Sequence, residues 1–115
     1  MFLGIDTSNY TTSLALFDGK NIIQRKKVLT VKKGERGLRQ SDAVFQHTVN
    51  MPLLMNELDF SSGIDSVGVS TRPRSVEGSY MPCFLVGENV ATAVSKTSNV
   101  PLYKTSHQVG HILAA

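Results

Sequence analysis

The chain has 115 residues, of which 41% are hydrophobic and 18% charged, so it has the size and composition of one globular domain and is not a disordered chain. The single cysteine, Cys83, excludes an internal disulfide, and the short apolar runs exclude a signal peptide and a membrane span, so a cytoplasmic protein is expected. The formal net charge is +3, and seven of the 12 lysines and arginines lie between positions 25 and 39, a cluster that suits either RNA phosphates or a solvated loop.

The first 17 residues contain the most informative pattern in the chain. Residues 2–5 are mainly apolar, residues 6–9 are small and polar, and alternation of apolar and polar residues resumes over residues 11–17. This pattern predicts a buried strand over residues 2–7, a tight polar turn, and a second strand over residues 11–17. Such a turn is either an ordinary hairpin connection or a place to hold a phosphate. The residues that would hold it are Thr7, Ser8, Asn9, Thr11 and Thr12.

The segments that follow extend the sheet. Asp18 and Gly19 predict a hairpin turn, so a strand expected over residues 21–31 completes an antiparallel meander of three strands. Residues 32–40 are rich in glycine and positive charge, and they are expected to form a surface loop.

Two helices are expected to pack on this sheet. The first, over residues 41–58, is predicted to begin at Ser41 and to kink at Pro52. Its predicted buried stripe consists of Val44, Thr48, Met51, Met55 and Leu58. The second, over residues 83–96, is expected to hold Cys83 as a small core residue and not as a reactive thiol. The other expected elements are strands over residues 64–70 and 102–105, a loop over residues 71–82, and a third helix capped by Ser106.

This order of elements predicts an α/β domain with a mixed five-stranded sheet and helices on both faces. The same order forms one half of an actin-like, or ribonuclease H-like, fold. The loop over residues 71–82 would lie at the carboxyl end of a parallel strand, where ligands bind in such sheets. Because an apolar helical run reaches Ala115 without a stop signal, residues 1–115 are expected to be a single subdomain, the N-terminal part of a longer protein.

Three segments carry a resemblance to a known family. They are the opening GIDTSNYTTSLALFD, the internal TVNMPLLMNEL and the closing VPLYKTSHQVGHILAA. In this order they resemble the N-terminal portion of the tRNA adenosine threonylcarbamoyltransferases, formerly described as O-sialoglycoprotein endopeptidases. The resemblance covers nearly the whole chain.

The resemblance implies transfer of a threonylcarbamoyl group from an ATP-derived adenylate to an adenosine of tRNA, with a divalent iron or zinc ion helping to hold the donor. His107 and His111 match two metal ligands of the family, and residues four apart share one face of a helix. The family's third ligand, an aspartate, has no counterpart here, so no stoichiometric metal is expected on this chain. Arginine holds phosphate well, which adds Arg72 and Arg74 to the expected donor-binding residues.

Two departures from the family's pattern keep other functions open. Tyr10 and Thr11 stand where the family carries acidic residues, and Arg72-Pro73-Arg74 stands where it has Gly-Pro-Gly. These differences favour a non-catalytic paralogue, or a module that pairs with an actin-like subunit or with a second copy of itself. The histidine pair argues against an actin-like ATPase or sugar kinase, and the lack of a carboxylate between the histidines argues against a peptidase. No catalytic residue is assigned.

Overall fold

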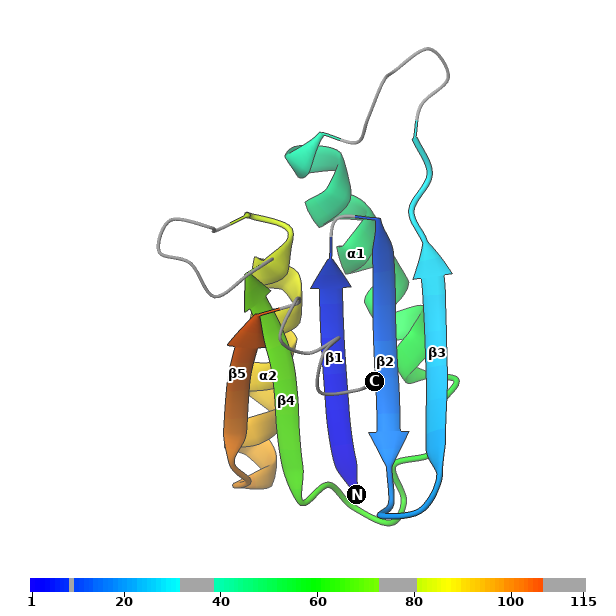
Figure 1. Ribbon diagram of the computed structural model, residues 1–115, viewed down its shortest axis with the longest axis vertical. Coiled ribbons are helices and arrows are strands. Elements are labelled where there is room, and N and C mark those ends of the chain that lie inside the picture. Colours follow the sequence, from blue (N-terminus) through cyan, green and yellow to red (C-terminus); the bar gives the residue numbers. More distant parts are fainter. Residues whose placement is uncertain (9, 32–38, 73–80, 107–115) are drawn as a thin grey trace.

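The computed structural model describes residues 1–8, 10–31, 39–72 and 81–106. In chain order the elements are β1 (Phe2–Ser8), β2 (Thr11–Phe17), β3 (Ile22–Val28), α1 (Gln40–Met55), β4 (Ser66–Arg72), α2 (Phe84–Ser98) and β5 (Leu102–Ser106). The strands form one sheet in the order β3-β2-β1-β4-β5 (Figure 1). The pairs β1 with β2 and β2 with β3 are antiparallel, whereas β1 with β4 and β4 with β5 are parallel. The prediction of an α/β domain with a mixed five-stranded sheet is therefore confirmed.

The hairpin turn between β2 and β3 forms where Asp18 and Gly19 predict it. The Asp18 carboxylate accepts hydrogen bonds from the backbone N–H of Asn21 (2.7 Å) and of Lys20 (2.8 Å), and these bonds lower the pKa of Asp18. Gly19 adopts a φ of +101°, which glycine reaches without a steric clash. The third strand is shorter than predicted, because β3 ends at Val28 and not at residue 31.

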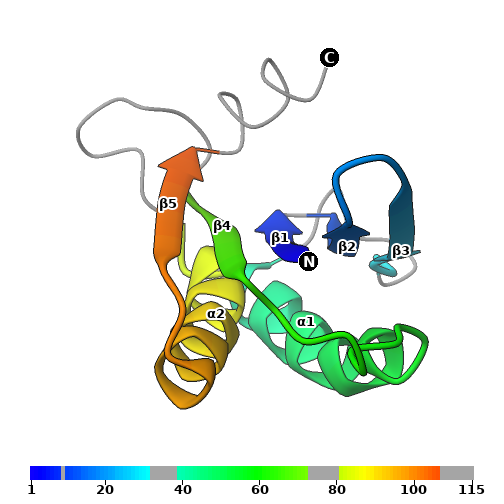
Figure 2. The same ribbon diagram turned by 90° about the horizontal axis from the view of Figure 1, so that it is seen from below.

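Both described helices pack against the same face of the sheet (Figure 2). In β1, Leu3 and Ile5 are buried toward the helices, whereas Gly4 and Asp6 point to the other face and are only partly buried. The sequence predicts helices on both faces, and α1 and α2 do not meet that expectation. The third helix expected after Ser106 lies outside the described residues. The face of the sheet that carries Gly4 and Asp6 is called the outer face below.

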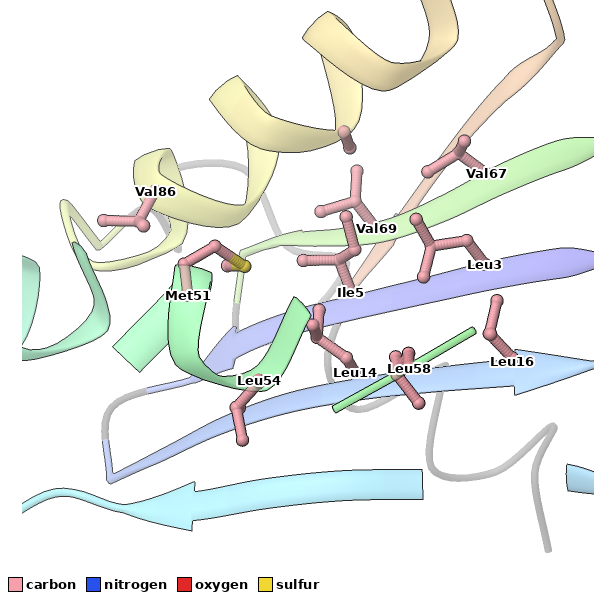
Figure 3. Close-up of a cluster of buried hydrophobic side chains, with 11 residues drawn as sticks. Leu3, Ile5, Leu14, Leu16, Met51, Leu54, Leu58, Val67, Val69 and Val86 are labelled. Atoms are coloured by element: carbon pink, nitrogen blue, oxygen red, sulfur yellow. The ribbon is translucent and has the colours of Figure 1, made fainter. Parts of the chain in front are cut away.

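The core lies between the sheet and the two helices (Figure 3). Leucine, isoleucine and valine side chains from β1, β2 and β4 meet Met51 and Leu54 of α1 and Val86 of α2. The buried members of this cluster are Leu3, Ile5, Leu14, Leu16, Met51, Leu54, Leu58, Val67, Val69, Val86 and Ala91. Burial of an aliphatic side chain of this size stabilises a fold by about 1.5–3 kcal/mol. The cluster is therefore the main source of the stability of the sheet and helices.

The helix α1 presents a different face to the sheet from the one that its sequence pattern predicts. Thr48 is exposed and Met55 is only partly buried, although both belong to the predicted stripe. The buried residues of α1 include His47 and Asn50 instead. Met51 and Leu58 of the predicted stripe are buried as expected, so the buried face is displaced from the predicted one by less than one residue, or less than about 100°. Hydrogen bonds to β2 account for the two polar side chains that face the sheet.

The ends of the two helices lie close to their predicted positions. The first helix begins at Gln40, one residue before the predicted Ser41, and contains Pro52 as expected, but it ends at Met55, three residues before the predicted end at Leu58. The second extends two residues beyond its predicted end, to Ser98, and Asn99 follows it in the left-handed conformation with a φ of +56°. Neither helix of the described ranges is long and apolar enough to cross a membrane.

Candidate functional site

The carboxyl ends of the parallel strands β1, β4 and β5 lie at one edge of the sheet (Figure 1). The turn between β1 and β2 and the first turns of α1 and α2 lie at the same edge (Figure 1). Ligands of open α/β sheets bind at such an edge. The described residues predicted to bind the donor all lie here, and they are Thr7, Ser8, Thr11, Thr12 and Arg72.

The Thr7 side chain links β1 to the first turn of α2. Its hydroxyl donates a hydrogen bond to the Cys83 carbonyl (2.9 Å) and accepts one from the Gly87 N–H (3.1 Å). In a regular α-helix the Gly87 N–H would donate to the Cys83 carbonyl. The Thr7 hydroxyl therefore lies between two backbone groups that would otherwise bond to each other. A Cβ atom on Gly87 would lie 3.0 Å from Thr7 Oγ1 and 3.2 Å from Ile5 Cγ2. Glycine at this position therefore allows the close approach of α2 to β1.

A second set of buried polar side chains, Thr12, His47 and Asn50, joins β2 to α1, and we call it the His47 cluster. Thr12 Oγ1 lies 2.7 Å from His47 Nδ1 and accepts a hydrogen bond from Asn50 Nδ2 at 3.2 Å. Thr12 and His47 are fully buried, and Asn50 is nearly so. Because Thr12 is the second residue of β2, the cluster lies directly after the turn between β1 and β2.

Burial determines the protonation of two titratable groups near this edge. Burial lowers the pKa of His47, and the Ser8 backbone carbonyl and the Asp6 carboxylate partly oppose this effect, so the ring is neutral at pH 7. Burial raises the pKa of the Cys83 thiol to about 11. The thiol is therefore protonated and inaccessible, in agreement with the prediction that Cys83 is a core residue.

The predicted donor-binding residues differ in their access to a ligand. Thr7 and Thr12 are fully buried, and their hydroxyls are bonded inside the protein, so they can act on a ligand only through neighbouring groups. Ser8 and Thr11 are partly exposed, and the Ser8 hydroxyl donates to the Thr11 carbonyl at 3.4 Å. Arg72, the last residue of β4, is exposed. Donor binding by these residues stays a prediction.

Four further predicted site residues lie outside the described residues, namely Asn9, Arg74, His107 and His111. Among the residues that the structure describes, no group of three or more His, Cys, Asp and Glu side chains could hold a metal ion. The metal site predicted from the two C-terminal histidines therefore stays a prediction.

His47 and Asn50 are not among the site residues predicted from the sequence. A signal for them exists, because both share a helical face with the apolar residues Ala43 and Leu54. Polar residues on an apolar stripe indicate buried hydrogen-bond partners, but the pattern does not say which strand supplies the partner. Only the packing of α1 against β2 places Thr12 beside them.

The mixed sheet, its crossing helices and the polar edge at its parallel carboxyl ends define an α/β protein with half of an actin-like fold. Solved structures of two proteins from Pseudomonas aeruginosa share this fold. An uncharacterized protein with similarity to the peptidase YeaZ has a TM-score of 0.62 and 15% identity, over 91% of this chain and 42% of that protein. YeaZ has a TM-score of 0.57 and 16% identity, over 91% of this chain and 43% of its own. At these identities the similarity concerns the fold alone.

The relatives found by sequence all carry one name, tRNA N6-adenosine threonylcarbamoyltransferase. The protein from Bacillus subtilis strain 168 is 31% identical over 120 residues, and those from Campylobacter curvus and Campylobacter fetus are 31% and 28% identical over 117 residues. Each match covers 97% of this chain, but the chain spans only about a third (33%) of the length of these curated relatives. No family model matches the chain. The chain is a distant homologue of the N-terminal third of the threonylcarbamoyltransferases.

Proposed function

We propose that the chain is the N-terminal, donor-binding part of a threonylcarbamoyltransferase-like protein, which transfers a threonylcarbamoyl group from its ATP-derived adenylate to an adenosine of tRNA. The observation that carries this proposal is the convergence of the β1 to β2 turn, the end of β4 and the start of α2 at one edge of the sheet. The 31% identity to the Bacillus subtilis enzyme over 97% of the chain supports it.

The chemistry of this edge suits a ligand that carries a phosphate. Arg72 is exposed at the end of β4, and a guanidinium group binds phosphate or carboxylate oxygens through paired hydrogen bonds. Ser8 and Thr11 flank the turn at the same edge and add hydroxyl and backbone groups. We assign donor binding to these three residues, and to Asn9 and Arg74 beyond the described ranges.

Titration with adenosine monophosphate, followed through the amide signals of Ser8 and Thr11, tests donor binding. Arg72→Ala should weaken the binding about tenfold, the usual effect of losing one hydrogen bond to a charged group. Lys20→Ala is the matched control, because it removes the same charge from the hairpin turn at the opposite end of the sheet. No binding by the wild-type protein, or equal affinities of the wild-type and Arg72→Ala proteins, would contradict the proposal.

We propose His107 and His111 as two ligands of a divalent iron or zinc ion in the full-length protein. Bound there, the ion would help to hold the donor through its oxygen atoms. The support for these ligands is their spacing of four residues, which suits one helical face, and the resemblance to the family. Two ligands hold a metal weakly, so the 115-residue chain should bind no stoichiometric metal. Tight zinc binding, measured by calorimetry, that survives His107→Ala together with His111→Ala would contradict this assignment.

A pairing function is the second candidate, and exposed side chains of α1 favour it. Phe45, Val49 and Leu53 follow one another at intervals of four residues, so they form one ridge along the helix. Their exposed fractions are 67%, 46% and 48%. Apolar surface of this kind is typical of sites that bind another protein. The proposed partner is a paralogous actin-like subunit or a second copy of the chain.

Sedimentation of the protein at increasing concentration tests this pairing. Phe45→Asp should shift the protein toward the monomer, because it places a charge in the apolar ridge. Ile22→Asp is the matched control, since Ile22 is also 67% exposed but lies on the outer face of the sheet. A wild-type protein that stays monomeric would exclude pairing between copies, and association that Phe45→Asp leaves unchanged would exclude the α1 ridge.

A further inference from the structure

The strand β3 forms one lateral edge of the sheet. In the strand order β3-β2-β1-β4-β5, β2 is its one neighbour within the described part of the chain, so the other side of its backbone is a free edge (Figure 1). All seven residues of β3 are exposed. The edge of a sheet presents a row of backbone N–H and C=O groups, and another extended chain can pair with them.

Hydrogen bonds at the two ends of the hairpin show how β3 is paired with β2. The Asp18 N–H donates to the Asn21 carbonyl at 3.3 Å, and the Leu29 N–H donates to the Tyr10 carbonyl at 2.7 Å. These two bonded pairs flank the register of β2 and β3. In an antiparallel ladder, hydrogen-bonded and non-bonded pairs alternate, so the pairing can be counted from either end with the same result.

This alternation divides the residues of β3 into two sets. The set that bonds to β2 consists of Ile23, Arg25 and Lys27. The set that directs its backbone N–H and C=O groups to the free edge consists of Ile22, Gln24, Lys26 and Val28. The Gln24 carbonyl accepts a hydrogen bond from Arg25 Nη1 at 2.9 Å, which places this guanidinium at the free edge. A carbonyl oxygen has two lone pairs, so it can also accept a bond from an added strand.

The side chains of β3 determine which kind of strand fits this edge. Arg25 and Lys27 lie on the helix-facing side of the sheet, since both pair with buried residues of β2. On the outer face, Lys26 lies between the exposed apolar side chains of Ile22 and Val28. The edge is therefore basic on one side and apolar at both ends of the other. A strand that alternates carboxylate and apolar side chains complements both sides.

We propose that β3 binds an acidic, extended segment of another polypeptide, which pairs with the free edge and adds a strand to the sheet. Carboxylates of this segment lie beside Arg25 and Lys27, and its apolar side chains lie beside Ile22 and Val28. The described ion pair of Arg25, from Nε to Glu57 Oε1 at 3.8 Å, joins two exposed groups and is weak, so the guanidinium can turn to the new carboxylates. None of the predicted donor-binding residues belongs to β3, so this binding is independent of the proposed function.

Charge and backbone chemistry favour this partner over a second copy or an RNA. Antiparallel pairing of two β3 strands would place the basic side chains of both copies on adjacent strands, where like charges destabilise the pair. RNA phosphates would be attracted by the same charges, but β3 has no aromatic side chain on which a base could stack. Its outward carbonyls also need donors, which phosphate oxygens lack. An extended polypeptide supplies donors and acceptors together.

A peptide as long as β3, with alternating valine and glutamate and with blocked ends, is the probe. Amide hydrogen exchange, followed by NMR, measures its effect residue by residue. In the free protein the amides of Arg25 and Lys27 should exchange slowly and those of Gln24 and Lys26 quickly. The peptide, at about ten times its Kd, should slow the exchange of Gln24 and Lys26 about tenfold. Exchange that is fast at all four amides, or that the peptide leaves unchanged at Gln24 and Lys26, would overturn the proposal.

Two substitutions of Lys26 separate the backbone from the charge. Lys26→Ala removes the charge and keeps the outward N–H, so the peptide should bind only about twofold more weakly. Lys26→Pro removes the charge and the outward N–H but no bond to β2, so binding should weaken at least about tenfold. Circular dichroism checks the folding of both. Gln24→Pro with Gln24→Ala is the replacement pair if Lys26→Pro does not fold. Equal affinities of a folded alanine and proline pair would overturn strand addition.

The other occupants are distinguished by three further measurements. A peptide with lysine in place of glutamate should bind at least about tenfold more weakly, and equal binding would overturn the acidic partner. If the outward amides become protected as the protein concentration rises without peptide, a second copy occupies the edge. If oligouridine binds and Lys26→Ala and Lys26→Pro weaken it equally, while the acidic peptide does not bind, the basic residues hold RNA. Either result would overturn the proposal.

Discussion

The two faces of the sheet are built from the same strands but differ in what packs on them. On the face toward α1 and α2, Leu3, Leu14 and Val67 are fully buried. On the outer face, Phe2 and Phe17 are 37% and 40% exposed among the described residues. Successive residues of one strand therefore make very different contributions to stability, because within the described part of the chain it is the helix-facing residues that are enclosed by neighbours.

The outer face has an apolar row of its own near the amino end of β1. Phe2 pairs with Phe17, and Phe17 pairs with Ile22, so all three side chains share this face. The Phe2 ring packs over Gly68, where an added Cβ would lie 2.6 Å from the ring atom Cζ. Glycine lets the ring lie directly on the strand. These side chains can move into solvent, so substitutions in the row should cost less than those in the core.

The largest expected difference between the faces comes from Leu14→Ala. This substitution leaves a cavity in the core, so the free energy of unfolding should fall by about 3 kcal/mol. Ser13 precedes Leu14 in β2 and lies on the outer face, so Ser13→Ala should change the free energy of unfolding by less than about 0.5 kcal/mol. Chemical denaturation of both variants measures the difference. Equal effects would mean that the two faces contribute alike.

Two glycines on opposite sides of β1 give the next comparison: Gly87 of α2, which packs on the helix-facing side, and Gly4 of β1, which lies on the outer face. A methyl group on Gly87 would lie 3.0 Å from Thr7 Oγ1 and 3.2 Å from Ile5 Cγ2, whereas on Gly4 no atom would lie closer than 3.9 Å. Gly87→Ala should lower the free energy of unfolding by about 2 kcal/mol through crowding. The better helix propensity of alanine should offset up to about 1 kcal/mol of this loss. Gly4→Ala should leave the melting temperature nearly unchanged. A Gly87→Ala protein as stable as Gly4→Ala would argue against the close approach of α2.

The pH dependence of stability sharpens the comparison, because the helix-facing side of the sheet holds a buried histidine. Burial lowers the pKa of His47 below its ordinary value of 6.5, so the unfolded chain binds more protons than the folded one just below that pH. The resulting stability is fully present above pH 6.5 and is lost as the pH falls through the folded pKa of His47. Urea denaturation between pH 5 and 8 should show this loss in the wild-type protein and a smaller one in His47→Gln. Identical pH profiles would contradict it.

The smallest effect is expected on the outer face. Ile22→Thr keeps a β-branched side chain at a position that is 67% exposed, so the free energy of unfolding should change by less than about 0.5 kcal/mol. Thermal unfolding measures it. A loss as large as that of Leu14→Ala would show that the apolar row is covered in solution.

The strands could be predicted from the sequence because their pattern is local. Apolar residues at every second position place β2 over residues 11–17, where the structure has it, and β1 within one residue of its observed end. Asp18 and Gly19 predict the hairpin turn for the same reason, since the hydrogen bonds of the turn join residues two and three apart.

The order of the elements and the mixed sheet could be predicted from the local sequence pattern, because periodicity reflects contacts within an element and between close neighbours. The pattern did not determine which side of α1 faces β2, nor that α1 and α2 share one face of the sheet. Thr12 and His47 are 35 positions apart, and Thr7 and Gly87 are 80 apart. A buried polar group is stable only where another element supplies its partner, so these positions were decided by the packing of the helices on the sheet.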